Sequence, residues 1–461
     1  MGLRQLVVAA AMAVGLGLAT APEAKSETLA EALAYAYEHS GLLEQNRALL
    51  RIADEDVAQA VAGLRPIINW AGNITAAWPV APASPINPAG GDLVSASLTL
   101  TIDQLLYDGG ASRYEIEAAR ESVLATRQDL LQVEQQVLLR AITAYLDVRR
   151  QTEFVALRRS NVRVITEELR AARDRFEVGE VTRTDVSLAE ARLAAARSEL
   201  AAAEAALSRA RAEFRVAIGR DPGSLRVPRP APVPATLEEA KAYAVRNHPA
   251  IRSVQHSVQA AELTILAAEA AQGPSLTLRG TISVDENLDD RETLGLNFGG
   301  PIYQGGALPS QIRALMARRD STRAQLHIIR HDIEQGVANA FAGLAAARSR
   351  TEAFERQVRA ATVAFNGVRE EATLGARTTL DVLNAEQELL DARTNLISAQ
   401  VDEIEASFQV LFAMGLLTAE HLNLAVQLYD PEAYYNLVKD APAAVSEQGR
   451  ALDRVLEAIG D

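Results

Sequence analysis

Hydrophobic residues recur at every seventh position along several long stretches of the chain. Between residues 183 and 219, large side chains form this row and alanines occupy positions between them: Val186, Leu193, Leu200, Leu207 and Phe214, with Ala189, Ala196 and Ala203. A sustained seven-residue repeat is typical of helices that pack as coiled coils, and alanine lets the helices approach closely. The pattern predicts long helices over 111–178 and 307–374, each followed by a second helix that ends near Gly219 or Gly415.

A glycine interrupts the helical pattern between the members of each pair. The turns share a glycine and, just inside the following helix, an aspartate: Gly179 with Asp185, and Gly375 with Asp381. Glycine adopts the left-handed conformation that ends many helices, and a threonine side chain caps the start of the next one. In the second turn Thr378 or Thr379 can serve as that cap. We therefore expect two helical hairpins with similar tips.

The chain is a duplication, because matching segments precede the two tips in the same order. A helical stretch over 28–63 has its counterpart over 236–272, and the hinge sequence LYDGG at 106–110 has its counterpart in IYQGG at 302–306. A proline-rich stretch between the copies indicates a linker. The predicted organisation is a signal peptide, a first repeat, a linker, a second repeat and a C-terminal segment, over 1–26, 27–219, 220–235, 236–415 and 416–461.

Two pairs of segments between the helices alternate between apolar and polar side chains. The apolar positions are Ile68, Trp70, Ile74, Trp78, Val94, Leu98, Leu100 and Ile102 in the first pair, and Leu276, Leu278, Ile282, Val284, Leu294, Leu296 and Phe298 in the second. This period predicts four strands with one apolar face, each long enough to cross a membrane when tilted. A proline-rich loop over 79–90 joins the first pair. An ordinary two-sheet sandwich is the alternative, but four strands leave little to cover the apolar face.

The composition narrows the class of protein. None of the 461 residues is cysteine, which excludes disulfides, thiolate metal sites and a lipid-bearing N-terminal cysteine. The formal net charge of −14 argues against nucleic acid as a partner. Residues 1–26 read as a secretory signal, with Arg4, an apolar run over 6–18 and the small-x-small sequence AKS at 24–26. No later segment is apolar for about 18 residues, so we expect no transmembrane helix.

These motifs together resemble the TolC-type outer-membrane channels, which are the exit ducts of type I secretion and multidrug efflux systems. The resemblance covers about residues 27–424 and rests on the duplicated layout, the two hinge sequences, and the tip sequences FEVGEVTRTDV and LGARTTLDVLNAEQELLDAR. It implies a mixed α and β membrane protein, in which a trimeric 12-stranded β-barrel with four strands per protomer continues into a long periplasmic α-helical coiled-coil barrel. The residues also favour an oligomer, because four strands cannot close a barrel and open edges in lipid leave backbone groups unsatisfied.

The resemblance also implies the location and the partners. We expect a homotrimer in the outer membrane, in contact with lipid and with a long periplasmic extension. Its expected partners are a periplasmic adaptor protein and an inner-membrane ABC or other efflux transporter. The resemblance implies no enzymatic activity and no cofactor.

At the tips, the resemblance implies a gate. Arg377 corresponds to an arginine that bonds to the region of Thr184 and Asp185 in the other tip and holds the entrance shut. Asp381 corresponds to an acidic ring that constricts the pore. Asn384 stands where the family has a second ring aspartate, so we expect a weaker cation site. Ala372 stands where the family has a gating tyrosine, so we expect one closing contact fewer at the tips.

Some of the candidate residues have simpler interpretations. Asp185 and Asp381 each lie in a first helical turn, where a carboxylate interacts favourably with the helix dipole. His327 and His331 are four positions apart and could share a metal, but no metalloprotease-like glutamate follows, and a solvated helix face explains them better. The sequence thus favours no catalytic or metal site.

Two classes of function remain. The first is a passive exit duct that a translocase and its adaptor open. The alternative is a periplasmic structural coiled coil that binds a partner without channel activity. The alternation of apolar and polar positions in all four strands favours the duct.

Overall fold

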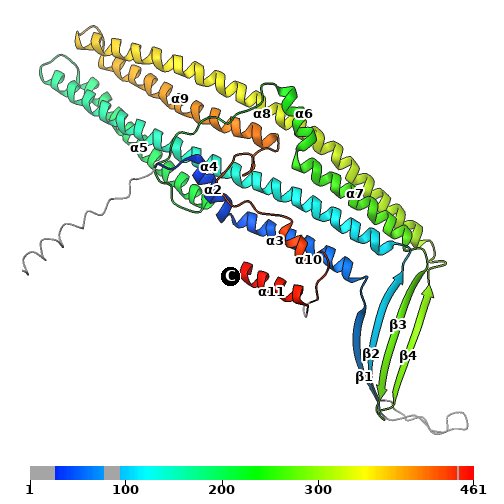
Figure 1. Cartoon of the computed structure of the whole chain (residues 1–461). Coiled ribbons are helices and arrows are strands. Elements are labelled where there is room, and N and C mark those ends of the chain that lie inside the picture. The colour runs from blue at the N-terminus through cyan, green and yellow to red at the C-terminus, as the bar shows by residue number, and fades with distance from the viewer. Residues whose placement is uncertain (1–25, 77–93, 444–445, 461) are drawn as a thin grey trace, which may run out of the picture. The chain divides into compact units, whose positions relative to one another are not determined.

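The computed structural model describes residues 26–76, 94–443 and 446–460, apart from some side chains near the C-terminus. The predicted signal peptide, apart from Ser26, and the loop over 79–90, together with Trp78, lie outside the described residues. The chain forms two compact units. One comprises the residues through Ser40 with 134–237 and 337–427, and the other comprises 41–133, 238–336 and the residues from 428 onward. Each unit therefore draws on both sequence repeats (Figure 1).

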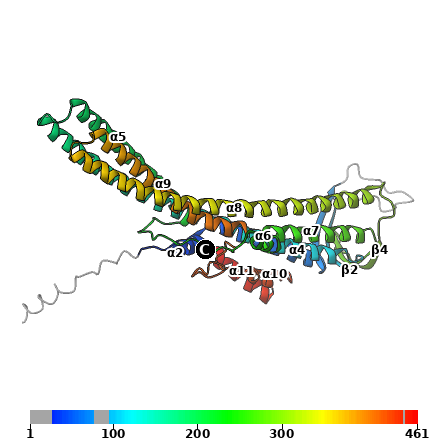
Figure 2. The ribbon, with the colours of Figure 1, turned by 90° about the horizontal axis from the view of Figure 1, so that it is seen from above.

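The first unit is helical. It contains α2 (Leu29–His39), α5 (Arg183–Ile218), α9 (Thr379–Ala413) and the C-terminal parts of the two longest helices, α4 (Ala111–Glu177) and α8 (Ala307–Thr373). In both views α4 and α5 form one hairpin, and α8 and α9 form the other (Figures 1 and 2). The long helices predicted from the seven-residue repeat are therefore present, and their ends lie within about two residues of the expected positions.

The residues of the seven-residue row form the cores of the hairpins. Ala189, Leu193 and Ala196 of α5 are buried against Ile165 and Leu169 of α4. The equivalent core of the second hairpin joins helices α8 and α9 through Ala361, Phe365, Ala372, Val382, Leu389 and Ala392. Small alanines at these contacts let the helix backbones approach closely, as the pattern predicted.

A buried tyrosine joins the linker to the start of the described chain. Tyr145 of α4 is fully buried, and its hydroxyl donates to the backbone carbonyls of Glu27 at 2.9 Å and Arg226 at 2.7 Å. Glu27 also pairs with Leu225 through a parallel backbone bridge. Burial raises the pKa of Tyr145 to about 12, so the phenol stays protonated and keeps its donor.

The second unit contains the sheet and the helices next to it. Its helices are α3 (Gly41–Ala62), α6 (Leu237–Asn247), α7 (Pro249–Ala270), α10 (Ala433–Val438), α11 (Glu447–Gly460) and the N-terminal parts of α4 and α8. None of the helices that the structure describes contains a stretch long and apolar enough to cross a membrane.

Two of the predicted helices are each broken in two. The stretch 28–63 divides into α2 and α3 at Ser40, whose backbone is extended (φ −75°, ψ 110°). The stretch 236–272 divides into α6 and α7 at His248, also extended (φ −62°, ψ 129°). Pro249 explains the second break, because proline lacks an N–H and forces the preceding residue out of the helical region. At the first break Gly41, a poor helix former, follows Ser40. The prediction of two unbroken helices was wrong.

The strands form one antiparallel sheet in the order β1-β2-β3-β4. They are β1 (Ile67–Ala76), β2 (Val94–Tyr107), β3 (Ser275–Asp285) and β4 (Asp290–Gly299). β2 extends into the predicted hinge as far as Tyr107, with an irregularity in its pairing to β3 after Leu105. The hinge turn itself begins one residue later, where Asp108 accepts hydrogen bonds from the backbone N–H groups of Gly110 and Ser112.

Candidate functional site

The two hairpin turns have the same backbone geometry. Gly179 and Gly375 have φ values of 82° and 77°, in the left-handed region that a side chain disfavours. After each glycine the next N–H reaches back to a carbonyl in the last turn of the helix: Glu180 to Arg175 and Ala376 to Glu371, both at 2.9 Å. These backbone bonds satisfy carbonyls that the helix end would otherwise leave exposed.

Both tip aspartates complete capping boxes. Thr182 is the N-cap of α5, and the Asp185 carboxylate accepts from its backbone N–H at 2.9 Å and its hydroxyl at 2.7 Å. Thr378 is the N-cap of α9, and Asp381 accepts the same two bonds at 3.0 and 2.8 Å. Hydrogen bonds from the threonines lower the pKa of both aspartates, so both carboxylates are ionised near neutral pH. Of the two caps considered from sequence, the structure uses Thr378.

Arg377 bonds within its own hairpin. Its Nε donates to Glu371 Oε2 at 2.8 Å, and both side chains are half exposed. This bond and the charge of Glu371 raise the pKa of Arg377. Thr184 is exposed on the first turn of α5. The expected link from Arg377 to the region of Thr184 and Asp185 therefore stays a prediction. Sequence reasoning missed Glu371, although it lies only six positions before Arg377.

Farther from the turns, polar side chains join the two hairpins. Arg192 of α5 donates to Asn384 Oδ1 of α9 at 3.2 Å. The guanidinium of Arg369 on α8 lies 3.5 Å from the carboxylate of Glu168 on α4, which is buried. Leu383 adds an apolar contact, since it is buried in the α4–α5 core. The structure thus gives Asn384, which was singled out from sequence, a partner on the other hairpin.

A second polar link involves a half-buried glutamate. Asn161 of α4 donates to Glu386 Oε1 of α9 at 3.4 Å. Burial raises the pKa of Glu386, with smaller opposing contributions from the Asn161 bond and from the charges of Arg393 and Arg369. Sequence reasoning missed both residues, because neither belongs to a motif.

The sheet has one largely apolar face, on which Gln104, Asp290 and Glu292 are polar positions. Cross-strand pairing places Trp70 beside Leu100 and Leu100 beside Ile282, and it places Leu278 beside Leu296. Many of these side chains are exposed in the single chain, including Trp70 at 76%, Leu296 at 64% and Phe298 at 72%. An apolar surface of this extent marks a site that lipid or protein covers.

The opposite face of the sheet is polar. Asn69, Thr101, Thr281 and Thr293 lie side by side across the four strands. One ion pair interrupts the hydroxyl-rich surface, where Arg279 Nε donates to Asp103 Oδ1 at 2.5 Å between directly paired positions. The two faces therefore fit different surroundings, one apolar and one aqueous.

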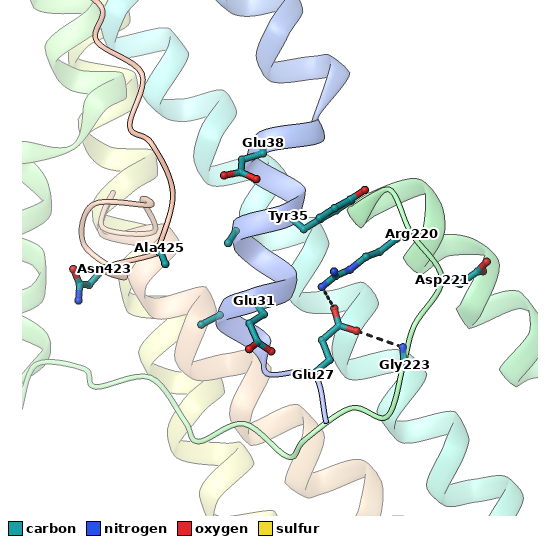
Figure 3. A pocket seen from close by; sticks show the side chains of 11 residues that line it. Glu27, Glu31, Tyr35, Glu38, Arg220, Asp221, Gly223, Asn423 and Ala425 are labelled. Atoms are coloured by element: carbon teal, nitrogen blue, oxygen red, sulfur yellow. Dashed lines mark hydrogen bonds and ion pairs between the residues drawn. The ribbon is translucent and has the colours of Figure 1, made fainter. Parts of the chain in front are cut away.

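An open pocket of about 670 Å³ lies in the first unit beside α2 (Figure 3). Arg220 crosses its wall, donating to Glu27 at 2.6 Å and lying 4.6 Å from the centre of the Tyr35 ring. Gly223 N–H donates to the other carboxylate oxygen of Glu27 at 3.4 Å. These contacts tie the start of the chain to the linker, which gives them a structural role.

No metal site is visible in the part of the chain that the structure describes, since no three His, Asp or Glu side chains gather there as ligands. The histidine pair from the sequence is exposed on α8, and His331 lies 3.8 Å from Glu334 on the same helix. That arrangement is an ordinary solvated helix face.

The sequence matches a known protein family. The sequence model described as "Outer membrane efflux protein" matches residues 33–220 and 243–416, one segment in each repeat. The chain belongs to the outer membrane efflux protein family. It is 35% identical over 445 residues to the outer membrane efflux protein BepC of Brucella suis biovar 1 (strain 1330), covering 95% of this chain and 96% of that protein. It is 26% identical over 360 residues to the outer membrane protein TolC of Escherichia coli (strain K12), covering 73% and 72%.

Solved structures share the fold. The channel protein CusC matches with a TM-score of 0.75 at 18% identity, covering 85% of this chain and 92% of that one. The outer membrane protein VceC of Vibrio cholerae matches with a TM-score of 0.73 at 20% identity, covering 84% and 96%. The resemblance to outer-membrane efflux channels and the duplicated, mixed α and β fold predicted from sequence are confirmed.

Proposed function

We propose that this protein is the outer-membrane exit duct of a tripartite type I secretion or efflux system, and that it conducts substrate passively to the exterior. The observation that carries the proposal is the four-stranded sheet with an exposed apolar face and a polar face. Such a sheet satisfies its backbone in lipid only when its two edge strands, β1 and β4, pair with other chains. Three chains supply twelve strands, with lipid on the apolar side and a water-filled lumen on the polar side.

The names of the relatives support the same role. They include the alkaline protease secretion protein AprF and the pyoverdine export outer membrane protein OpmQ, both of Pseudomonas aeruginosa. An outer-membrane duct needs an energised partner, because no nucleotide or ion gradient drives transport there. We therefore assign a periplasmic adaptor and an inner-membrane transporter as partners, with the outer membrane as the location.

The helical tips supply the gate of this duct. In the closed assembly, Arg377 exchanges its half-exposed partner Glu371 for the region of Thr184 and Asp185. Asp381 and Asn384 line the constriction. Because hydrogen bonds from Thr378 keep Asp381 ionised, three copies around one axis would attract cations.

Planar-bilayer recording tests the channel function. Purified full-length protein, extracted in detergent and added to a lipid bilayer, should insert and give discrete conductance steps that favour cations. A periplasmic coiled coil without channel activity would give none. The absence of steps from protein that is folded by circular dichroism would overturn the proposal.

A further inference from the structure

Residues 429–441, which we call the C-terminal strap, lie along α3 and are held at one end by this helix and at the other by the segment that follows it. At one end the Arg47 guanidinium lies 5.0 Å from the centre of the Tyr429 ring. At the other end Arg65 donates to the backbone carbonyls of Asp440 and Ala441. Helix α10, within the strap, packs on α3 (Figure 1). Two arginines, Arg47 of α3 and Arg65 three residues past its end, thus hold the two ends of the strap.

The middle of the strap is an apolar contact with polar links on either side. Tyr434 and Val438 are buried against Ala58 of α3. The Tyr434 hydroxyl donates to Glu55 Oε1 at 2.6 Å, and burial together with this bond raises the pKa of Tyr434. The phenol therefore remains a donor.

Helix α4 holds the strap from a second side. Arg127 Nη1 donates to Glu432 Oε1 at 2.9 Å, and the Arg127 guanidinium also lies 5.4 Å from the centre of the Tyr435 ring. The Arg127 side chain is only 13% exposed, whereas Glu432 is 64% exposed. Arg127 therefore lies mostly buried beneath the strap, whereas Glu432 lies at its exposed edge.

Asp54 lies on the same face of α3, one helical turn before Ala58, and is 0% exposed. Among the described residues, neither of its carboxylate oxygens has a hydrogen-bond partner. The positive charge of Arg127 lowers the pKa of Asp54, whereas the negative charge of Glu55 raises it. The charge of Asp54 in turn acts on the hydroxyls of Tyr429 and Tyr434 in the strap. A buried, unbonded carboxylate is costly when ionised and far less costly when protonated.

We propose that the C-terminal strap is a proton-controlled latch, in which Asp54 fastens the strap when protonated and loosens it when ionised. Opening the strap would return water to the carboxylate, so the ionised form favours the open state. The open and closed states should differ in their affinity for this proton, because Asp54 is buried, without a hydrogen bond that stabilises its charge, on the face of α3 that the strap packs against. Besides Arg127, Glu55, Tyr429 and Tyr434, the charged groups around this contact are Arg47, Arg51, Glu44 and Glu432.

The direction of the pH effect follows from linkage. Burial raises the pKa of Asp54 from 3.8 to about 6 in the closed state. The closed state therefore binds the proton more tightly than the open state does. The free energy that protonation of Asp54 contributes to closure is complete below about pH 4 and is lost as the pH rises through 6. With a pKa of 3.8 in the open state and about 6 in the closed state, lowering the pH from about 7.5 to about 5 increases the equilibrium constant for strap closure about tenfold.

Amide hydrogen exchange of the full-length protein in detergent measures strap opening directly. Protection factors of residues 434–438, corrected for the intrinsic pH dependence of exchange, should be about tenfold higher near pH 5 than near pH 7.5. Asp54→Asn should give the same protection at both pH values. Asp56→Asn is the matched control, because Asp56 is exposed on the same helix, and it should keep the wild-type pH dependence.

Two outcomes would overturn the latch: equal protection of the wild-type strap at both pH values, or a wild-type pH dependence in Asp54→Asn. The wild-type comparison decides the question even where that variant fails to fold. Arg127→Gln gives an independent check, since removing the cation that opposes burial should move the midpoint of the pH dependence above 6. An unchanged or lower midpoint would show that Asp54 is not the switching group.

Discussion

At the residue scale, the tip aspartates have a structural task before any role in a channel. Asp185 and Asp381 each close a capping box, which gives the second helix of each hairpin a defined start. The same bonds keep both carboxylates ionised. A substitution at either aspartate therefore changes a helix start as well as the charge at the tip. Arg377 carries no such task, because it lies outside the capping box and is half exposed.

The variants Arg377→Ser and Asp381→Ala should distinguish the proposed closing contact of Arg377 from the proposed acidic ring of Asp381. Removing Arg377 deletes the cation proposed to hold the second tip inward, so single-channel conductance in planar bilayers should rise. Removing Asp381 deletes the charge proposed to line the constriction, so cation selectivity and block by multivalent cations should fall, with a smaller effect on opening. Glu371→Gln is the control, since it removes the partner of Arg377 within its own hairpin and should not open the pore. Unchanged conductance in Arg377→Ser together with an open pore in Asp381→Ala would contradict the assignment.

At the scale of elements, the sheet determines which surface meets which medium. Strict alternation places neighbouring residues on opposite faces, so Leu100 and Thr99 differ in surroundings although they are adjacent in β2. Leu100 lies between Trp70 and Ile282, whereas Thr99 lies between Ala71 and Ser283. The pair offers a matched test of the membrane assignment.

Leu100→Arg should destabilise the folded barrel by about 2–4 kcal/mol, because it places a charge on the lipid face near the bilayer midplane. Thr99→Arg should cost much less, because its charge enters the aqueous lumen. The shift on SDS gels between folded and heat-unfolded protein, measured against urea, reports the difference. Equal losses from both substitutions would mean that the faces have been misassigned.

At the scale of the whole molecule, neither repeat is a compact unit by itself. The helical unit and the unit with the sheet each contain segments from both repeats. The pairing of β2 with β3 joins the repeats within one sheet, and β1 and β4 form the edges of that sheet. A single chain therefore presents two strand edges for pairing with other chains, which is the physical basis for assembly.

Native mass spectrometry of the detergent-extracted protein should give the mass of three chains. Three copies close the sheet with twelve strands, whereas two would leave little lumen after the side chains are placed. The trimer should persist on dilution, because dissociation exposes strand edges and the apolar face together. A stable soluble monomer would contradict both the trimer and the membrane assignment.

Much of the fold is determined by local pattern, and the sequence predicts those parts correctly. The long helices follow from the seven-residue row, and the strands follow from alternation, because each pattern reports which face of an element is buried. The hairpin turns follow from Gly179 and Gly375, whose φ values are those that glycine favours. The breaks at Ser40 and His248 were missed, because apolar periodicity continues across each of them.

The contacts between elements were decided only by the tertiary structure. The sequence identifies Arg377 and Asn384 as candidates, but it does not reveal Glu371 and Arg192 as their partners, since a side chain's partner depends on how helices pack. Asp54 is the sharpest case. In the sequence it is one charged residue among several on an amphipathic helix, and only the folded structure shows that it is buried, on the helix face against which Tyr434 and Val438 pack. Periodicity records the average environment of a helix face, whereas the charge state of one carboxylate depends on the particular groups that cover it.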